Sequence, residues 1–361
     1  MIDYIDAVIP MKHKEIIRNG HKTITKKDGS TSNVNYPIRI FGSNGGSIQV
    51  QSVDKEHIRI IGNLAMFIQG QNVYGTDNLI SLGCKAFAEI AELLDIKPTK
   101  ENRRQWRAGD YQVNTLDVTY NFNLSSQPNV CNWLNQAAVS LGSGKQMVET
   151  YRASKSPDIE SIYLGRTSTF ISVKFYNKYL QLSRGAKNRK KIKEGGPTLK
   201  ELVDSTKGLL RGEIRFHKRY LKEHELTMAR DLVPSVLRQH FYGKMKEIHL
   251  GQSTILPVED IKGLTTSQRL AYQLWIKGGD AKSEMTESTF YRAQDHFLKS
   301  GVDIGTPFVE GVCGRKLRSY LVQSNVAVVP NFLLGTHWYF KPGSGKNVHS
   351  DRNNNQQIPN N

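Results

Sequence analysis

Cysteine is scarce in this chain of 361 residues. The three cysteines, Cys84, Cys131 and Cys313, are widely spaced and odd in number, so they predict neither a CxxC pair nor a disulfide framework. Long apolar runs are also missing, since no stretch approaches the roughly 18 consecutive apolar residues of a membrane span. The N-terminus lacks the pattern of a signal peptide. We therefore expect a protein of a reducing cytoplasm with no membrane partner.

Several common catalytic motifs are absent too. The ten histidines include no His-x-His pair, and no Cys/His spacing suits zinc. Residues 142–145 are only a fragment of the phosphate-binding GxxxxGK[ST] motif, so we expect no ATP hydrolysis by the chain itself. Basic residues, by contrast, are abundant. The 50 Lys and Arg against 33 Asp and Glu give a formal charge of +17, which indicates a polyanionic partner such as DNA.

The hydrophobic pattern predicts an α+β chain, with an antiparallel sheet flanked by helices and then a C-terminal helical domain. A helix is expected over 78–94, where apolar residues recur at helical spacing, and another around 129–140. Alternating apolar and polar residues predict strands, of which the informative ones are 113–123, 161–165, 169–178 and 210–218.

From about residue 222 the periodicity becomes helical. Helix candidates at 267–277 and 288–300 have a spacing that fits a helix-turn-helix unit or an ordinary packed hairpin. We therefore expect one domain over 1–225, a helical domain over 226–342 that is a candidate for helix-turn-helix-like DNA binding, and a disordered polar tail over 343–361.

The strand over 169–178 carries an unusual polar face. If it is extended, Lys174, Tyr176 and Lys178 share one side. Two ammonium groups would favour the phenolate and attract phosphate, as a tyrosine nucleophile attacking DNA requires. The alternative from this strand alone is a solvated face with a half-buried tyrosine.

Two carboxylates lie on comparable faces of other predicted strands. Asp117 belongs to the strand over 113–123, and Glu213 belongs, with Arg215, to the strand over 210–218. If these strands neighbour that of Tyr176, the carboxylates could bind Mg²⁺ or Mn²⁺, which would polarise a scissile phosphate. Alternatively, they form surface ion pairs with the many basic groups.

Several blocks resemble the replication initiators of filamentous phages, the gene-two endonuclease family. Residues 68–76 read Ile-Gln-Gly-Gln-Asn-Val-Tyr-Gly-Thr, where the family has approximately Leu-Gln-Gly-His-Asn-Val-Phe-Gly-Thr. Residues 116–120 and 208–215 match further family strands, and the opening Met1-Ile2-Asp3 also fits. Residues 161–166 and 173–178 are similar to plasmid rolling-circle initiators, which carry a Tyr-x-Gly strand followed by a Tyr-x-Lys strand.

The resemblance implies a rolling-circle nickase-like catalytic domain over 1–225, which cuts one strand of supercoiled origin DNA and later rejoins it. It implies Tyr176 as nucleophile, giving a phosphotyrosine intermediate, with Lys178 as its electrostatic partner. Asp117 and Glu213 would hold Mg²⁺, together with Gln71, which replaces the family's histidine. The residues expected to contact DNA are Lys174, Arg166, Arg215, Arg189, Lys190 and Lys191.

The expected setting is the cytoplasm of a bacterial host, with a host helicase, a polymerase and a single-strand binding protein as partners. Tyr179 is expected to serve packing, because two tyrosines three residues apart on a strand point to opposite faces. The main rival function is a non-catalytic basic DNA-binding protein, such as a phage repressor or packaging factor. A role in recombination or integration rather than replication also stays open.

Overall fold

The computed structural model describes most of the chain. The described residues are 1–25, 28, 30–141, 148–152, 158–186, 198–248, 250, 261–299, 302, 304, 305, 308 and 314–343. The predicted basic contacts Arg189, Lys190 and Lys191 lie outside these ranges, as does the predicted tail beyond Gly343.

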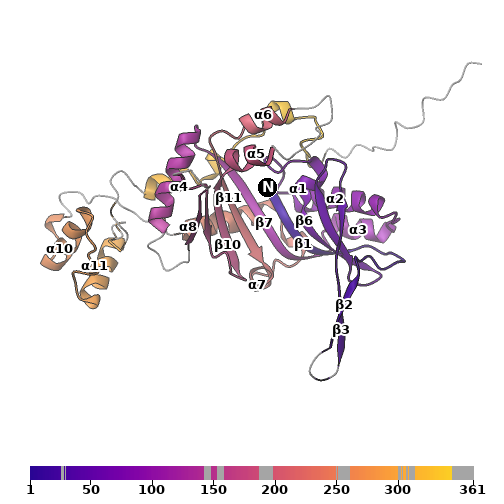
Figure 1. Ribbon diagram of the computed structural model, residues 1–361, viewed down its shortest axis with the longest axis horizontal. Coiled ribbons are helices and arrows are strands. Elements are labelled where there is room, and N and C mark those ends of the chain that lie inside the picture. Colours follow the sequence, from indigo (N-terminus) through magenta and orange to yellow (C-terminus); the bar gives the residue numbers. More distant parts are fainter. Residues whose placement is uncertain are drawn as a thin grey trace, which may run out of the picture.

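A sheet of nine antiparallel strands forms the centre of the molecule, in the order β4-β5-β6-β1-β7-β11-β10-β9-β8 (Figure 1). A separate two-stranded hairpin, β2–β3, projects from the body. The strands are β1 (Ile2–Pro10), β2 (His21–Thr25), β3 (Thr31–Asn35), β4 (Ile38–Phe41), β5 (Ser47–Ser52), β6 (His57–Asn63), β7 (Gln112–Asn123), β8 (Val148–Tyr151), β9 (Ser161–Leu164), β10 (Ile171–Asn177) and β11 (Leu209–His217).

Helices flank this sheet, and several of the helices in the chain begin at a side chain that caps their first turn. Asn78, for example, accepts a hydrogen bond from the Ser81 backbone N–H at the start of α2. The helices are α1 (Leu64–Gln69), α2 (Leu79–Leu93), α3 (Lys100–Ala108), α4 (Gln127–Leu141), α5 (Lys178–Ala186), α6 (Leu199–Asp204), α7 (Lys218–Glu223), α8 (Pro234–Glu247), α10 (Thr266–Ile276), α11 (Glu287–Lys299) and α12 (Gly314–Ser319).

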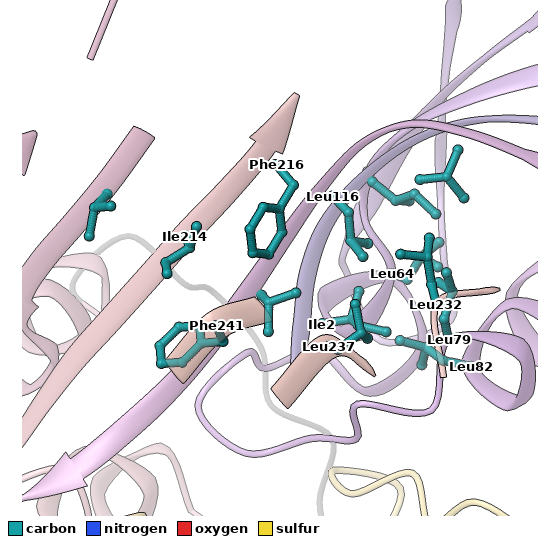
Figure 2. Close-up of a cluster of buried hydrophobic side chains, with 14 of the residues drawn as sticks. Ile2, Leu64, Leu79, Leu82, Leu116, Ile214, Phe216, Leu232, Leu237 and Phe241 are labelled. Carbon is teal, nitrogen blue, oxygen red and sulfur yellow. The ribbon is translucent and has the colours of Figure 1, made fainter. Parts of the chain in front are cut away.

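One hydrophobic core joins the apolar face of the central strands to the helices. In Figure 2, Leu237 and Phe241 of α8 lie in the same cluster as Leu116 of β7 and Phe216 of β11. Aromatic contacts continue this packing, with the rings of Phe241 and Tyr120 in an edge-to-face arrangement at 4.8 Å. The apolar side of the sheet is thus buried, which leaves its polar side to carry the chemistry.

The fold class predicted from the sequence, an antiparallel sheet with flanking helices, is confirmed. The helix over 78–94 and the strands over 113–123, 161–165 and 210–218 appear with ends shifted by a residue or two. The strand predicted over 169–178 is shorter. It ends at Asn177, whose side chain accepts a hydrogen bond from the Leu180 N–H and so begins helix α5 at Lys178.

The C-terminal part of the chain divides between two cores. Buried side chains of residues 226–250 and Leu317 and Leu321 belong to the main core. A second core is built only from residues of α10, α11 and their connections, among them Trp275 and Phe297. Because α8 packs on the sheet, the main core continues beyond the predicted boundary at residue 225.

After α12 the chain returns to the sheet. The Ala327 N–H donates to the Asn121 carbonyl, and Val326 bridges Phe122. This segment therefore pairs with the end of β7 that extends past the first residue of β1. Leu333 and Trp338 then pack with Val73 in a third cluster. We call residues 325–340 the C-terminal strap. No helix of the described residues is long and apolar enough to cross a membrane.

Candidate active site

The register of β7, β11 and β10 gathers the polar residues expected from the sequence. Residues directly opposite each other in antiparallel strands lie on the same face. The predicted residues therefore share one polar face of three neighbouring strands. The paired positions are Tyr176 with Arg211, Lys174 with Glu213, and Asp117 with Arg215.

Tyr176 lies at the centre of this face and is buried. Its hydroxyl donates to Glu213 Oε2 at 3.5 Å. Three cationic groups surround its ring, with Lys174 Nζ 4.4 Å, Lys178 Nζ 5.7 Å and Arg211 Cζ 6.0 Å from the ring centroid. Burial raises the pKa of Tyr176 well above its usual value, while the charge of Arg211 lowers it. In the free protein this tyrosine is thus a neutral phenol with cationic groups around its ring and a carboxylate at its hydroxyl.

Lys178 begins helix α5 and reaches back toward the site. Its side chain is fully buried, and Nζ donates to Asn72 Oδ1 at 3.2 Å and to Gln181 Oε1 at 3.0 Å. These bonds hold the ammonium beside the Tyr176 ring. The predicted neighbourhood of the two residues is therefore present, although Lys178 reaches it from a helix rather than from the strand.

A buried pair, Asp3 and Arg211, completes the surroundings of Tyr176. Arg211 is fully buried; its Nη2 lies 3.1 Å from Asp3 Oδ2, and its Nη1 donates to the Asn72 carbonyl. Asn63 and Asn72 both donate from their amide groups to Asp3 Oδ1. The guanidinium is thus locked next to the tyrosine ring by the first strand and by the loop after α1.

Asp117 and Arg215 form a bidentate pair on the same face. Arg215 Nε and Nη2 donate to the two carboxylate oxygens at 2.7 and 2.6 Å. The carboxylate is buried, and burial together with the charge of Glu213 raises the pKa of Asp117 to about 7 against the pull of Arg215. Arg215 also lies over the ring of Tyr4, at 4.7 Å.

Glu213 is the carboxylate that accepts a hydrogen bond from the Tyr176 hydroxyl in the described part of the chain. Burial and the charge of Asp3 raise its pKa, and Asp3 and Glu213 also raise that of Asp117. No group of three His, Cys, Asp or Glu side chains within the described ranges is arranged to hold a metal ion. The mutual repulsion of these carboxylates is nevertheless a feature that a bound cation would relieve.

Gln71 lies in a tight loop that follows α1. Gly70 ends the helix with φ +72°, a conformation that favours glycine. The Gln71 Oε1 accepts the backbone N–H groups of Val73 and Tyr74, at 2.6 and 3.0 Å, and its Nε2 donates to the Trp338 carbonyl. The amide oxygen expected to bind a metal is thus engaged with the backbone of its own loop.

The other predicted residues are spread along the edge of the site. Arg166 pairs with Glu149 at 2.9 Å and is largely exposed, as a DNA contact would be. Tyr179 is not on the strand, because α5 has already begun. Its half-buried ring lies near Lys207, whose Nζ is 5.8 Å from the ring centroid, and the strand geometry predicted for it was wrong.

Sequence reasoning missed Asp3, Asn72 and Arg211 as site residues. Arg211 alternates with Glu213 on one strand face, which was the available signal. Asp3 and Asn72 belong to segments singled out only for their family resemblance. Their convergence depends on pairing across more than 60 residues of chain, which a single sequence does not show.

Comparison with known proteins matches this chain to a family of phage proteins. A family model for the N-terminal part of the phage replication-associated protein, the product of gene two, matches residues 1–234. The chain is 27% identical over 315 residues to the replication-associated protein of Enterobacteria phage I2-2, covering 84% of this chain and 88% of that protein. The rolling circle replication initiator protein from Geobacillus stearothermophilus aligns over 72% of this chain and 88% of its own, with 13% identity and a TM-score of 0.33.

Proposed function

Because this chain belongs to the family of the phage replication-associated protein encoded by gene two, we propose that it initiates rolling-circle replication by nicking one strand of its origin DNA. The proposed nucleophile is Tyr176, which would join the 5′-phosphate and release a 3′-hydroxyl for the polymerase. The phosphotyrosine linkage would conserve the energy of the broken phosphodiester bond, which is then available for rejoining the displaced strand.

The observation that supports this proposal most is the arrangement around one tyrosine. Lys174, Lys178 and Arg211 place three cationic groups near the Tyr176 ring. They favour the phenolate and the extra negative charge of a pentacoordinate phosphate. Burial holds the hydroxyl neutral in the free protein. We therefore infer that the hydroxyl loses its proton only after DNA has entered and changed the surroundings of the ring.

The proposed proton acceptor is Glu213, which receives the Tyr176 hydroxyl hydrogen bond. Glu213 is also the residue best suited to bind Mg²⁺ or Mn²⁺, since magnesium is commonly held by one or two carboxylates and the substrate's own phosphate. A bound cation would supply polarisation of the scissile phosphate. Asp117 would hold the guanidinium of Arg215 in position, and Gln71 would shape the loop that carries Asn72.

The remaining basic residues are proposed as phosphate contacts outside the reacting centre. Arg166 and Lys174 lie beside each other on the tyrosine side of the sheet, as both approach the ring of Tyr163. Arg189, Lys190 and Lys191 fall in a basic run between α5 and α6. We also propose that the chain acts in the cytoplasm of a bacterial host, with host helicase, polymerase and single-strand binding protein.

The rival of a non-catalytic DNA-binding protein is not favoured, since the family match covers the segment that carries the tyrosine and its carboxylates. A helical DNA-binding domain remains part of the proposal. We place its DNA-binding role in α10 and α11, which have a core of their own.

The test uses supercoiled DNA that carries the origin of the genome encoding this chain. Tyr176→Phe should bind this DNA, yet form neither nicked circles nor a protein–DNA complex that survives denaturant. Tyr179→Phe is the matched control and should nick normally, because Tyr179 lies outside the cluster of cations. Undiminished nicking by Tyr176→Phe would overturn the assignment.

A further inference from the structure

A cavity of about 400 Å³ opens directly beside Tyr176, at the edge of the sheet formed by β8 and β9 and under helix α5. Its volume is within the range of roughly 300–1,000 Å³ that is usual for small-ligand sites. Because Tyr176 is one of its walls, whatever fills the cavity lies beside the side chain of the proposed nucleophile.

The strand register explains why a hollow exists there. Ser161 stands opposite Tyr176 on one side and opposite Tyr151 on the other. A small side chain thus sits between two aromatic rings in a row across three strands. In the neighbouring row, Tyr163 stands between Glu149 and Lys174.

Two features of the lining suit a nucleotide. Tyr151 and Tyr163 offer aromatic rings, and Tyr151 is 57% exposed. Lys174 Nζ lies between two rings, 4.7 Å from the centroid of Tyr163 and 4.4 Å from that of Tyr176. An ammonium in that position can meet a phosphate at the nucleophile while a base attached to that phosphate stacks in the cavity.

Polar groups at the rim can read the edge of a base. Arg166 is paired with Glu149, and Arg184 donates to both oxygens of the nearly buried Glu160. Guanidinium groups donate to acceptors on a base edge, and carboxylates accept from its amino groups.

We propose that this cavity is a subsite for a single unpaired nucleotide of the nicked strand, the one adjoining the scissile phosphate, with its base stacked on Tyr163. The proposal rests on the proposed function, since it places the phosphate at Tyr176. It makes Tyr163 a determinant of which position of the origin is cut. Recognition of an extruded base also requires that the DNA be locally melted, as in supercoiled DNA.

The experiment couples one protein substitution to one missing base. Single-stranded origin oligonucleotides are made with an abasic site at each of the three positions on either side of the nick, and their affinity is measured by fluorescence anisotropy. For the wild-type chain, one position should show a loss of about 5- to 150-fold, corresponding to one stacked base. In Tyr163→Ala that loss should disappear, while Tyr163→Phe should keep it.

Two further variants make the result decisive. Tyr36→Ala removes an exposed tyrosine that does not line the cavity and should leave the abasic pattern unchanged. If Tyr163→Ala does not fold, Tyr163→Leu keeps apolar bulk on β9 without an aromatic face and should show the same loss of coupling. Equal abasic penalties at every position in the wild type and in Tyr163→Ala or Tyr163→Leu would overturn the subsite.

Failure of the subsite and failure of the proposed function give different results. If the cavity does not hold a base, the wild type still forms a covalent DNA adduct through Tyr176. Only the dependence of the abasic penalty on Tyr163 is then missing. If Tyr176 is not the nucleophile, that adduct is absent whatever the abasic scan shows.

Discussion

The chemistry of single residues in this site is dominated by burial. Tyr176, Asp117 and Glu213 all have raised pKa values, and burial is the largest cause in each case. Arg211 opposes this effect at the tyrosine, because its fully buried guanidinium cannot be screened by water. Burial thus favours the neutral form of each of these three groups, and a bound cation would favour their charged forms.

The raised pKa of Asp117 predicts a dependence of stability on pH. The pKa of Asp117 is about 7 in the folded chain, above its usual value of 3.8. The folded state therefore holds a proton that the unfolded state has lost, so this group's contribution to stability falls as pH rises from about 4 to 7. We expect the free energy of unfolding of the wild type, relative to Asp117→Asn, to decline over this window in urea titrations. A wild type that gains stability there would show instead that Arg215 keeps the pKa of Asp117 low.

Among the secondary-structure elements, the strands could be predicted from the sequence, but the change from strand β10 to helix α5 was not predicted. Alternation revealed β7, β10 and β11, and with them the shared polar face of Tyr176 and Glu213. The change from strand to helix at Asn177 was missed because Lys178 continues the alternation in the sequence. The signal that could have revealed it was Asn177 itself, a good helix-capping residue.

The C-terminal strap was also unpredictable, since it depends on contacts between residues about 200 or more positions apart. Phe340 N–H donates to Gln69 Oε1, and the Trp338 carbonyl accepts from Gln71. These bonds tie the strap to the loop that carries Asn72, which in turn contacts Lys178. We therefore infer that the strap helps to position the lysine beside the tyrosine.

Two neighbouring leucines of the strap test its packing. Leu333 is fully buried in the third cluster, whereas Leu334 is 50% exposed. Leu333→Ala should lower the free energy of unfolding by about 2–5 kcal/mol, because it leaves a cavity. Leu334→Ala, the matched control, should change it by less than about 0.5 kcal/mol. Equal effects in urea denaturation would contradict the docking of the strap.

For the whole molecule, the separation of two cores matters most. Residues of α10 and α11 form a cluster that shares no member with the main core. The described packing also brings residues 226–250 and the strap into the unit that carries the site. We therefore propose a division into two units. The sheet unit would include residues 226–250 and the C-terminal strap, and the helical unit of α10 and α11 would lie between these two segments in the sequence.

Calorimetry can test this division with two phenylalanines. Phe297 is buried in the helical core and Phe241 in the main core. Phe297→Ala should destabilise one thermal transition by about 3–5 kcal/mol and leave the other unchanged, and Phe241→Ala should do the reverse. If both variants moved one common transition equally, the two units would fold as one.

The identity of the residue joined to DNA is the most direct test of the whole account. Trypsin cleaves after Lys174, Lys178 and Arg184, so Tyr176 and Tyr179 fall in the separate peptides 175–178 and 179–184. After reaction with origin DNA and nuclease digestion, mass spectrometry should find the nucleotide on peptide 175–178. Its presence on peptide 179–184, or on any other tyrosine, would contradict the claim that Tyr176 is the nucleophile.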